Sequence, residues 1–549
     1  MAFYTKNSDF TLPSPKYVTL TSQSQELDRV AIEEFGLIGL VLMENAGRSI
    51  FTHALDFWPE LKYPAKKIVI LCGPGQNGGD GWVLSRLFSN LGHKVLSYLI
   101  TSPGKEPRGD AGQNYLLAQK LGLSPKIIQD DSDPLPDFLA SDLIIDAIFG
   151  TGLDRPLSGQ PSRVLMAAAQ YKAQNPKTSV LAVDLPSGLS SSDGSCGPEV
   201  LAANLTVSLG TYKIGLFLNN GPKLSGQVRL GDIGLCAQMF KERPPQGLLL
   251  DSALAKTFLP PRPPWGHKGV FGHAVVAGGA GGKTGALALA ALGAQRSGCG
   301  LITAAHLDSA GDIFKTKLTG AMTLSLPDET DCLPGATAYQ TLLSFMENCQ
   351  ALGLGPGLGL GPKPSIFVKQ IVSSLNKPLV LDADALTNLA SLVETQGASL
   401  EGPNQNKLLE VAPRVITPHP GEAGRLLGCT PAKVNENRYA SAITLAQKFK
   451  AVAVLKGQYT IIAAPDGSFM INTSGNPILA TGGTGDVLTG LLTGLLAQNL
   501  PAFQASGLAV YLHGLAGDLA ASAQSPVGLT PDEIAGYLPK AWAELENQS

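Results

Sequence analysis

The sequence predicts two consecutive α/β domains, each built on a mainly parallel β-sheet with helices on both faces. Short apolar runs alternate with segments of helical apolar spacing along most of the 549 residues, which is typical of doubly wound sheets. The chain contains 63 glycines and only 15% charged residues, a composition that suits buried parallel strands joined by glycine-rich turns. A proline-rich stretch near the middle of the chain interrupts this alternation and separates the two series.

The first domain is expected over residues 1–240, with a Rossmann-like three-layer α/β/α arrangement. Residues 27–50 have helical apolar spacing, and a series of short apolar runs follows them. Helical segments separate several of these runs, so the strands are expected to lie parallel with helices on both faces. The predicted strands are Lys67–Leu71, Lys94–Ile100, Leu143–Ile148, Val180–Val183 and Leu205–Leu209.

Residues 241–261 are expected to form a proline-rich linker, because proline removes backbone donors and favours an extended chain. A second, larger α/β domain is expected over residues 262–549. Its glycine-rich segment 352–362 lies between a predicted strand and helix, which favours a functional turn over a linker. The predicted strands are His273–Ala277, Leu301–Ala305, Met322–Leu326, Ala351–Leu354, Pro378–Asp382, Val415–Thr417, Val452–Leu455 and Thr460–Ala463.

Charge and composition argue against several classes of partner. The formal net charge is −3 and no basic stripe is present, so neither nucleic acid nor an anionic membrane is expected as a partner. No window approaches about 18 apolar residues, the length a membrane-spanning helix needs, and residues 1–25 are too polar for a secretory signal. The seven cysteines show no CxxC or metal-ligand spacing, and scattered thiols favour a reducing cytoplasm.

Polar residues follow several predicted strands of the first domain. A glycine-rich turn at residues 73–81, GPGQNGGDG, precedes the predicted helix WVLSRLFSN, and backbone N–H groups at such a helix start can bind phosphate. Asp146 follows one strand, Asp184 follows the next, and Lys213 follows the last. A lone aspartate at a strand end is most often a cap, but several on neighbouring parallel strands predict a shared ligand cleft.

The segments GQNGGDG, DAIFGTGLDRPLSG and VDLPSG, with LMENAG at residues 42–47, resemble the NAD(P)H-hydrate epimerases over roughly residues 25–240. This resemblance implies Asp184 as the acid/base and as a substrate contact, with Lys213 nearby in the catalytic set. It implies a potassium ion near Asn77, Asp146 and Ser187. The remaining contacts to the hydrated nucleotide would come from Gln76, Asn77, Gly78, Gly79, Asp80, Gly150, Thr151, Gly152, Leu153, Asp154, Arg155 and Pro156.

The sequence departs from the epimerase pattern at Gln76, where the family usually has asparagine. Glutamine keeps the amide and adds one methylene, so the backbone role of this residue is retained. Two chemical routes to epimerisation stay open. The C6 hydroxyl of the hydrated ring can leave and return, or the ring can open and close again, and a carboxylate such as Asp184 can shuttle the proton in either case.

The second glycine-rich turn, GGTGDVLTGLL, covers residues 482–492. The N–H groups of residues 483–486 at a helix start would form an anion hole, and Asp486 would place a base beside an acceptor hydroxyl. This arrangement suits phosphoryl transfer. His419, between two prolines, is either a rigid loop residue or a ligand contact, and Asp382 and Asp384 are either strand-end caps or magnesium-side ligands.

This turn resembles the ribokinase-like superfamily, and KGVFG, GPGLG, DADAL, TPHPGE and KGQYT narrow the similarity to the ADP-dependent NAD(P)H-hydrate dehydratases, over about residues 262–545. The resemblance implies a ribokinase-like fold, ADP as co-substrate and Mg²⁺ at the nucleotide phosphates. It implies substrate contacts from Ala286, Gly355, His419 and Asp486, with Asp486 also the catalytic base. Nucleotide contacts would come from Lys456, Gly457, Gln458, Tyr459, Thr460 and Gly485.

The two resemblances together imply a bifunctional repair enzyme. Its first domain would interconvert the R and S epimers of NADHX and NADPHX, and its second would dehydrate the S epimer with ADP, giving NAD(P)H, AMP and phosphate. The alternative is a ribokinase-like small-molecule kinase with a non-catalytic domain that binds a nucleotide or a protein. The motifs of the first domain favour repair. Exposed sheet edges could pair and related enzymes often assemble, which leaves a homo-oligomer open.

Overall fold

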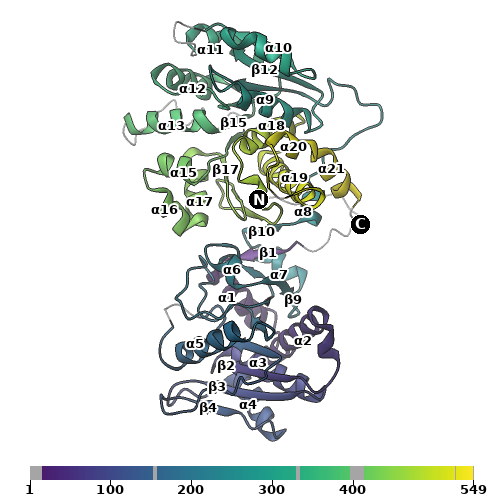
Figure 1. Ribbon diagram of the computed structural model, residues 1–549, viewed down its shortest axis with the longest axis vertical. Coiled ribbons are helices and arrows are strands. Elements are labelled where there is room, and N and C mark those ends of the chain that lie inside the picture. The colour runs from purple at the N-terminus through teal and green to yellow at the C-terminus, as the bar shows by residue number, and fades with distance from the viewer. Residues whose placement is uncertain (1–14, 153–156, 329–333, 396–412, 526, 548–549) are drawn as a thin grey trace. The chain divides into compact units, whose positions relative to one another are not determined.

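The computed structural model describes residues 15–152, 157–328, 334–395, 413–525 and 527–547. The chain divides into two compact units, a smaller one over Lys16–Gln246 and a larger one that starts at Gly247 (Figure 1). The unit boundary lies inside residues 241–261, where the sequence predicts a proline-rich linker. Within that segment, residues Gly247–Leu250 form β10 and residues Ser252–Lys256 form α8, because the apolar run GLLL adds to a sheet despite its proline-rich flanks.

The smaller unit contains a seven-stranded parallel sheet with the strand order β4-β3-β2-β5-β6-β7-β9. The order reverses between β2 and β5, the position at which doubly wound sheets bind ligands. All five strands predicted from the sequence are present, and the edge strands β4 and β9 are additional. The bounds are β2 Lys67–Cys72, β3 Lys94–Ile100, β4 Lys126–Ile128, β5 Leu143–Ala147, β6 Ser179–Val183, β7 Leu205–Leu209 and β9 Gln227–Gly231.

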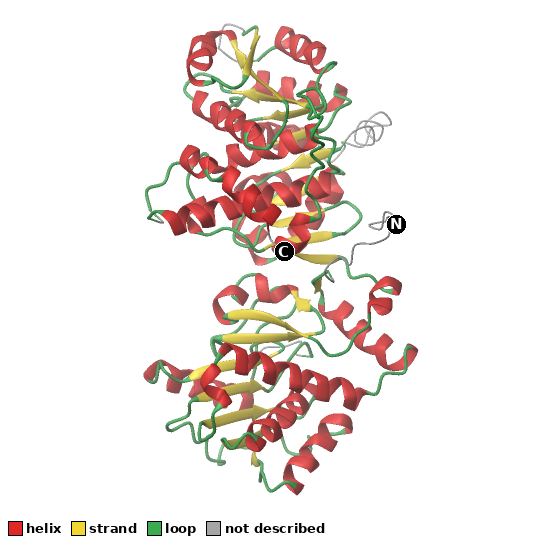
Figure 2. Ribbon diagram, turned by 90° about the vertical axis from the view of Figure 1, so that its right-hand side faces the viewer, coloured by secondary structure: helices red, strands yellow, loops and turns green. Residues whose placement is uncertain are grey.

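Helices cover both faces of this sheet, which confirms the predicted three-layer α/β/α arrangement (Figure 2). Alternate residues of β2 separate the two cores, because successive side chains of a strand point to opposite faces. Ile68 and Ile70 pack in one core with α2 (Gly39–Phe57) and α3 (Gln76–Asn90). Val69 and Leu71 pack in the other core with α5 (Gly159–Gln174). The strand-end loops are therefore held by two separate buried cores.

Two further elements of the smaller unit brace the end of β7. Residues Tyr17–Thr19 form β1, which pairs in parallel with β8 (Tyr212–Lys213), so Thr19 lies opposite Lys213. The hydroxyls of Thr19 and Thr211 are 2.8 Å apart and buried. Helix α1 (Thr21–Arg29) follows β1 directly. The start of the described chain therefore supports the segment that carries Lys213.

The larger unit is also an α/β structure, with the strand order β13-β12-β11-β14-β15-β16-β17-β18-β19-β10. Pairing is parallel from β13 to β17, antiparallel across β18, and parallel again between β19 and β10. The predicted strands are confirmed, and β19 is additional. The bounds are β11 His273–Gly278, β12 Leu301–Leu307, β13 Met322–Leu326, β14 Ala351–Leu354, β15 Leu379–Leu381, β16 Arg414–Ile416, β17 Val452–Leu455, β18 Ile461–Ala463 and β19 Phe469–Asn472.

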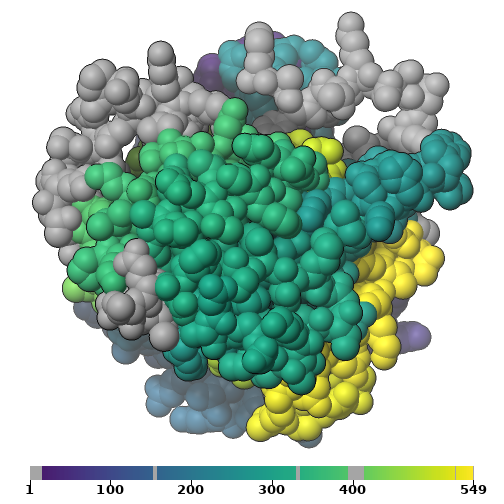
Figure 3. All heavy atoms as spheres, turned by 90° about the horizontal axis from the view of Figure 1, so that it is seen from above, coloured from purple at the N-terminus to yellow at the C-terminus, as the bar shows by residue number. Residues whose placement is uncertain are grey.

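A long apolar core holds the second glycine-rich turn in place. Helices α18 (Thr484–Ala497) and α19 (Ala502–Ala523) are almost entirely buried and share one hydrophobic cluster with strands of the sheet. Helix α9 (Thr284–Gln295) packs closely on α18, and Gly293 and Gly490 permit this approach, since an added Cβ would meet backbone atoms of the other helix. The remaining described helices include α10 Gly311–Lys317, α11 Ala336–Met346 and α12 Pro362–Ser374, whose residues contribute to the teal and green surface in Figure 3. Among the described helices, none combines the length and apolar character that membrane crossing requires.

Candidate active sites

Asp184 is the centre of a polar cluster at the carboxyl end of β6 in the smaller unit. Its φ of +65° is a left-handed conformation that residues other than glycine rarely adopt. Its Oδ1 accepts hydrogen bonds from Lys213 Nζ at 2.5 Å and from the Leu209 N–H at 3.0 Å, and both charged side chains are buried. These two donors fix the carboxylate through Oδ1, and within the described residues they leave Oδ2 for another partner.

The second oxygen of Asp184, Oδ2, faces the turn at Gly150. A methyl group added to Gly150 would lie 3.1 Å from Asp184 Oδ2 and 3.0 Å from Asn77 Oδ1, so both oxygens border one small space. Asn77 Nδ2 is buried and has no hydrogen-bond partner in the described part of the chain. A buried amide without a partner suits a polar ligand. The structure thus brings together residues from α3, the segment after β5, and the end of β6.

Asp146 and Ser187 connect these strand ends to the same turn. The Ser187 hydroxyl donates to Asp146 Oδ1 at 2.6 Å, and the Ser187 N–H donates to Asp146 Oδ2 at 2.8 Å. Burial raises the pKa of Asp146 to about 6, although the bonds from Ser187 oppose this shift. The Phe149 N–H donates to the Ser187 hydroxyl at 2.9 Å, one residue before Gly150. Thr151 and Gly152 follow in this turn, whereas Leu153, Asp154, Arg155 and Pro156 lie outside the described residues.

The first glycine-rich segment is helical, which corrects the turn expected there. Helix α3 begins at Gln76, so Asn77, Gly78, Gly79 and Asp80 belong to its first turns. Glycine is a poor helix former, but close packing requires it here. An added Cβ would lie 1.9 Å from the Gly73 carbonyl oxygen at Gly78, and 2.5 Å from the Met43 side chain at Gly79. The unpaired N–H groups of the helix start are therefore placed at the carboxyl end of β2.

Two carboxylates extend the charge cluster, and sequence reasoning missed one of them. Burial raises the pKa of Asp80 well above its usual range, and the negative charges of Asp184 and Asp28 raise it further. Asp28, on α1, is reached by solvent, yet the surrounding protein raises its pKa to about 6, with Lys213 opposing and Asp184 adding to the shift. No strand-end signal marks it, because it comes from a helix.

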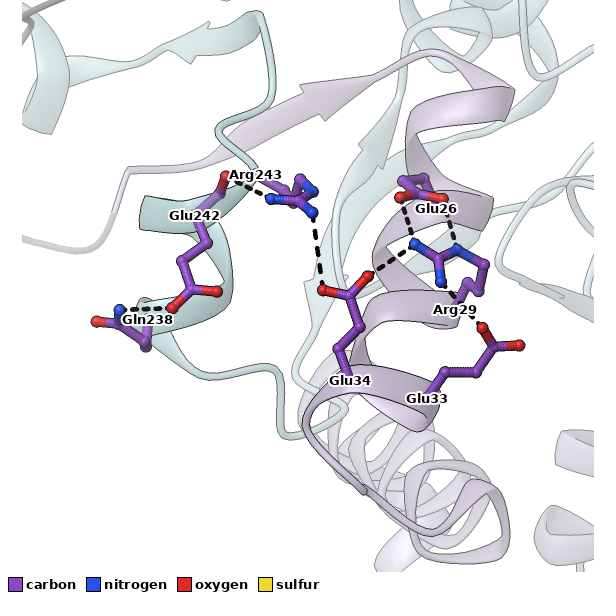
Figure 4. Close-up of polar contacts among 7 residues, drawn as sticks. All are labelled: Glu26, Arg29, Glu33, Glu34, Gln238, Glu242 and Arg243. Carbon is purple, nitrogen blue, oxygen red and sulfur yellow. Dashed lines mark hydrogen bonds and ion pairs between the residues drawn. The ribbon is translucent and has the colours of Figure 1, made fainter.

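Helix α1 is anchored so that Asp28 has a defined position. The Thr21 hydroxyl is 2.6 Å from the Ser191 hydroxyl. At the other end of the helix, Arg29 forms ion pairs with Glu26, Glu33 and Glu34, as Figure 4 shows. Arg243 lies 3.7 Å from Glu34 and connects this network to the end of α7 (Ala237–Glu242). These surface pairs position the helix and contribute little stability each.

Gly150→Ala tests whether the space beside Asp184 is used. Gly150 has no positive φ, so alanine is compatible with the backbone, but its methyl group would fill the space between Asp184 Oδ2 and Asn77 Oδ1. We expect the activity of the smaller unit to fall at least about tenfold, as for a misplaced reacting group, with no change in that of the larger unit. The wild type is the reference for both activities. An unchanged activity of the smaller unit in the variant would contradict this use of the space.

The second polar cluster surrounds the start of α18 in the larger unit. Gly483 caps this helix with φ +102°, a conformation that favours glycine. Asp486 is half-buried in the first turn. Burial and the neighbouring carboxylate of Asp382 raise the pKa of Asp486 to about 7, and Lys456 opposes this shift. A carboxylate with such a pKa can accept a proton near neutral pH.

Lys456 joins the strand ends to this helix. Its Nζ donates to Asp382 Oδ1 at 2.8 Å and lies 3.9 Å from Glu422 Oε2. Asp382 Oδ2 accepts a hydrogen bond from the Thr489 hydroxyl, on α18, at 2.6 Å. A Cβ added at Gly485 would be 3.4 Å from Lys456 Nζ, so the ammonium lies directly against the helix start. This is a suitable position for a group that binds nucleotide phosphate.

The loop after Lys456 is held in a tight conformation. Gly457 has φ +149° and Tyr459 has φ +50°, while the Thr460 hydroxyl donates to the Gly457 carbonyl at 3.0 Å. Buried Arg438 donates to the carbonyl oxygens of Gln458 and Leu455. Arg438 is a positioning residue that sequence reasoning missed, because the long-range contact between its helix and this loop leaves no local pattern.

His419 caps a helix and also exposes its ring. It caps α15 (Pro420–Leu427): its Nδ1 accepts a hydrogen bond from the Gly421 N–H at 3.0 Å, and its own N–H donates to Glu422. Burial and the charge of Lys456 lower the pKa of His419, which favours the neutral ring. The ring proton then lies on Nε2, which is 3.4 Å from Glu422 Oε1. The side chain remains 52% exposed and available to a ligand.

The remaining predicted contacts meet where two glycine-rich loops touch. Gly355 has φ +128°, and an added Cβ would lie 1.9 Å from the Asp382 carbonyl oxygen. At Gly357 it would lie 3.3 Å from the Ala286 Cβ. Asp384 Oδ2 accepts from Lys283 Nζ at 2.8 Å and from the Gly359 N–H at 2.9 Å. Among the described residues, no group of three or more His, Cys, Asp or Glu side chains could hold a metal ion.

Two families of known proteins match successive parts of the chain. Residues 274–540 match the family described as NAD(P)H-hydrate dehydratase, and residues 39–215 match the family described as YjeF-related protein N-terminus. The solved structure of an ADP/ATP-dependent NAD(P)H-hydrate dehydratase from Bacillus subtilis, co-crystallised with ATP and Mg²⁺, is 30% identical, with a TM-score of 0.46. It covers 54% of this chain and 98% of that chain.

Full-length relatives match both units at once. The bifunctional NAD(P)H-hydrate repair enzyme Nnr of Moorella thermoacetica is 36% identical over 535 residues, which cover 97% of this chain and 98% of the relative. The enzyme of the same name from Thermofilum pendens is 34% identical over 538 residues, 96% of each chain. The chain therefore belongs to the family of bifunctional NAD(P)H-hydrate repair enzymes.

Proposed function

We propose that the smaller unit interconverts the R and S epimers of NADHX and NADPHX, and that the larger unit dehydrates the S epimer with ADP as co-substrate. Membership of the repair-enzyme family supports this assignment. The observation that carries it is the presence of two separate clusters, each with a lysine paired to a buried aspartate at strand ends beside a glycine-rich helix start. The activities would belong to residues 1–240 and 262–549, respectively.

In the epimerase reaction, Asp184 would move the proton at the C6 hydroxyl of the hydrated ring. Lys213 and the Leu209 N–H hold Oδ1, so Oδ2 is the oxygen that exchanges the proton. The first turn of α3 and the segment 150–156 would bind the rest of the nucleotide. Both routes, loss of the hydroxyl and ring opening, need this proton transfer.

A potassium ion near Asn77, Asp146 and Ser187 would fit the donors present. Amide, carboxylate and hydroxyl oxygens suit a hard cation. Asn77 Oδ1 and Asp184 Oδ2 border the same space, and both are hydrogen-bond acceptors. When bound, the ion would reduce the repulsion between the carboxylates of this cluster.

In the dehydratase reaction, Asp486 would remove the proton from the C6 hydroxyl of the S epimer. The hydroxyl oxygen then bonds to the terminal phosphorus of ADP while the bond to the AMP oxygen breaks. Elimination of the resulting phosphate ester, with loss of the C5 proton, restores the C5=C6 double bond. The products are NAD(P)H, AMP and phosphate. Hydroxide is a poor leaving group. Phosphorylation of the C6 hydroxyl lets its oxygen depart as phosphate, which is a much better leaving group.

The larger unit offers groups for both substrates. Lys456 and the N–H groups at the start of α18 would bind the ADP phosphates, with Gly457, Gln458, Tyr459, Thr460 and Gly485 as further contacts. Ala286, Gly355 and His419 would contact the hydrate. Mg²⁺ would screen the nucleotide phosphates, and its ligands would come chiefly from those phosphates, since the described carboxylates form no metal cluster.

Two broader properties remain predictions. We propose a cytoplasmic setting, which the six free thiols of the described cysteines support. We also propose that the protein can assemble as a homo-oligomer, which light scattering coupled to size-exclusion chromatography would check.

The two activities can be tested together with a mixture of R- and S-NADHX. With ADP and Mg²⁺, the protein should restore the absorbance of NADH at 340 nm completely, and faster than spontaneous epimerisation allows. If recovery stops when the S epimer is consumed, the smaller unit is a binding module. If neither ADP nor ATP restores NADH, the repair function is wrong and the small-molecule kinase alternative gains support.

The dehydratase should also depend on pH through Asp486. A base acts only when unprotonated, and the pKa of Asp486 is about 7. We therefore expect kcat/KM for S-NADHX to rise with pH below about 7 and to level off above it. The measurement uses saturating Mg²⁺ to keep the ADP phosphates ionised across the range. A profile that is flat between pH 5.5 and 8.5, roughly the range around this pKa, would show that another group is the base.

A further inference from the structure

Lys283 is a cation of the larger unit that the proposed mechanism leaves without a role. It lies in the glycine-rich loop between β11 and α9, and its Nζ donates to Asp384 Oδ2 at 2.8 Å. Its side chain is 48% exposed. An ammonium group has three N–H donors, and Asp384 is the one partner shown for it within the described residues. Lys283 therefore presents donors to solvent while Asp384 holds it in position.

The position of Lys283 is fixed by the two glycine-rich loops of the site. The Ala280 N–H donates to the Gly357 carbonyl at 2.7 Å. A Cβ added at Gly357 would lie 2.6 Å from the Lys283 carbonyl oxygen and 2.8 Å from the Lys283 Cβ. Ala286 follows three residues later, on the same side of the first turn of α9. Lys283 is thus adjacent to the residues that would contact the hydrate.

Asp384 is also fixed. Besides Lys283, its Oδ2 accepts the Gly359 N–H at 2.9 Å, and its charge acts on Asp486. The Gly359 N–H therefore holds the Asp384 carboxylate, and this carboxylate holds Lys283 Nζ. The pair with Asp384 restricts the Lys283 ammonium group to the site.

An anionic ligand at this site depends on its lysines, because the neighbouring carboxylates repel negative charge. Asp382, Asp384, Glu422 and Asp486 all act electrostatically at the start of α18. Lys456 is already paired with Asp382 and near Glu422. The hydrated dinucleotide brings a pyrophosphate, and NADPHX brings an additional 2′-phosphate. Lys283 pairs with one carboxylate, Asp384, and its exposed ammonium keeps further N–H donors for such an anion.

We propose, on the basis of the proposed dehydratase function, that Lys283 binds a phosphate group of the hydrated dinucleotide and that Asp384 positions it for this contact. Lys456 then serves the phosphates of ADP, and Lys283 serves those of the second substrate. Two lysines on different loops divide the two anionic ligands between them.

Lys283→Met tests this assignment in the full chain, since methionine keeps an unbranched apolar stem and removes the charge. A hydrogen bond to a charged group is worth about 1.5–3 kcal/mol, so KM for S-NADHX and S-NADPHX should rise roughly tenfold or more. KM for ADP should be unchanged and kcat should change much less than KM. The KM of the hydrates should also depend less on salt than in the wild type. Lys283→Arg should recover part of the loss, and Asp384→Asn should raise KM to a smaller extent.

Lys315→Met is the matched control, because Lys315 forms a similar exposed pair with Asp312, at 3.2 Å, in the same unit. An equal rise of KM for both hydrates identifies the pyrophosphate, and a rise confined to S-NADPHX identifies the 2′-phosphate. The inference is overturned if KM for the hydrates equals that of the control variant, or if only KM for ADP rises. Failure of the proposed function itself is distinct, since the wild type would then form no NADH.

Discussion

Asp486→Asn is expected to lower kcat for dehydration of S-NADHX by about 10²–10⁴-fold, the usual contribution of a general base. Asparagine keeps the size of the side chain but cannot accept the proton of the C6 hydroxyl. The substitution also removes one of four carboxylates that act at the start of α18. Binding of ADP should therefore be retained or improved, because a negative charge near the phosphates is lost.

The assay follows NADH formation at 340 nm from purified S-NADHX, and a binding titration with ADP is made on the same preparation. Asp466→Asn is the control, since Asp466 is exposed in a turn and accepts a hydrogen bond from the Ser468 N–H. Epimerisation by the same variant, measured by chromatography of the two epimers, should equal that of the wild type. A loss of less than about tenfold would exclude Asp486 as the base, given the usual range of this contribution.

The meeting of polar residues at strand ends could be predicted from the sequence, because parallel strands place their carboxyl ends along one edge of the sheet. Asp146 lies one residue before the end of β5 and Asp184 directly follows the adjacent β6, and the structure brings both to the turn at Gly150. Buried apolar runs such as Ile68–Leu71 identify their strands without further information. The edge strands β4 and β9 escaped prediction, because half-exposed strands carry a weaker apolar signal.

The features that the sequence did not reveal depend on contacts between distant segments. Helix α3 starts at Gln76 because Gly78 packs on Gly73, a contact that helix propensity cannot indicate. The Lys283–Asp384 pair spans 101 residues, and Arg438 stabilises a loop that follows another strand. Asp28 lies on helix α1, far from the first cluster in sequence, and only the folded chain brings its charge near Asp184 and Lys213. Each of these residues is positioned by tertiary structure, for which one sequence without an alignment contains no pattern.

Asp184→Asn is expected to lower the rate of epimerisation by about 10²–10⁴-fold while hydrate binding persists. Oδ2 loses its ability to exchange a proton, whereas the Leu209 N–H can still bond to the amide oxygen. With R- and S-NADHX, ADP and Mg²⁺, the variant should form NADH rapidly from the S epimer and then only at the spontaneous rate. Full recovery at the wild-type rate would show that Asp184 is not the acid/base.

The same substitution removes the carboxylate that pairs with buried Lys213, and breaking such a pair costs about 3–5 kcal/mol of the free energy of unfolding. Lost epimerisation could then reflect unfolding of the smaller unit. The double variant Asp184→Asn/Lys213→Met separates the two causes, because it removes the unpaired charge together with the carboxylate. We expect its thermal stability to exceed that of Asp184→Asn while its epimerisation stays equally low. If the double variant recovers both thermal stability and the rate of epimerisation, Asp184 stabilises the fold and does not transfer the proton.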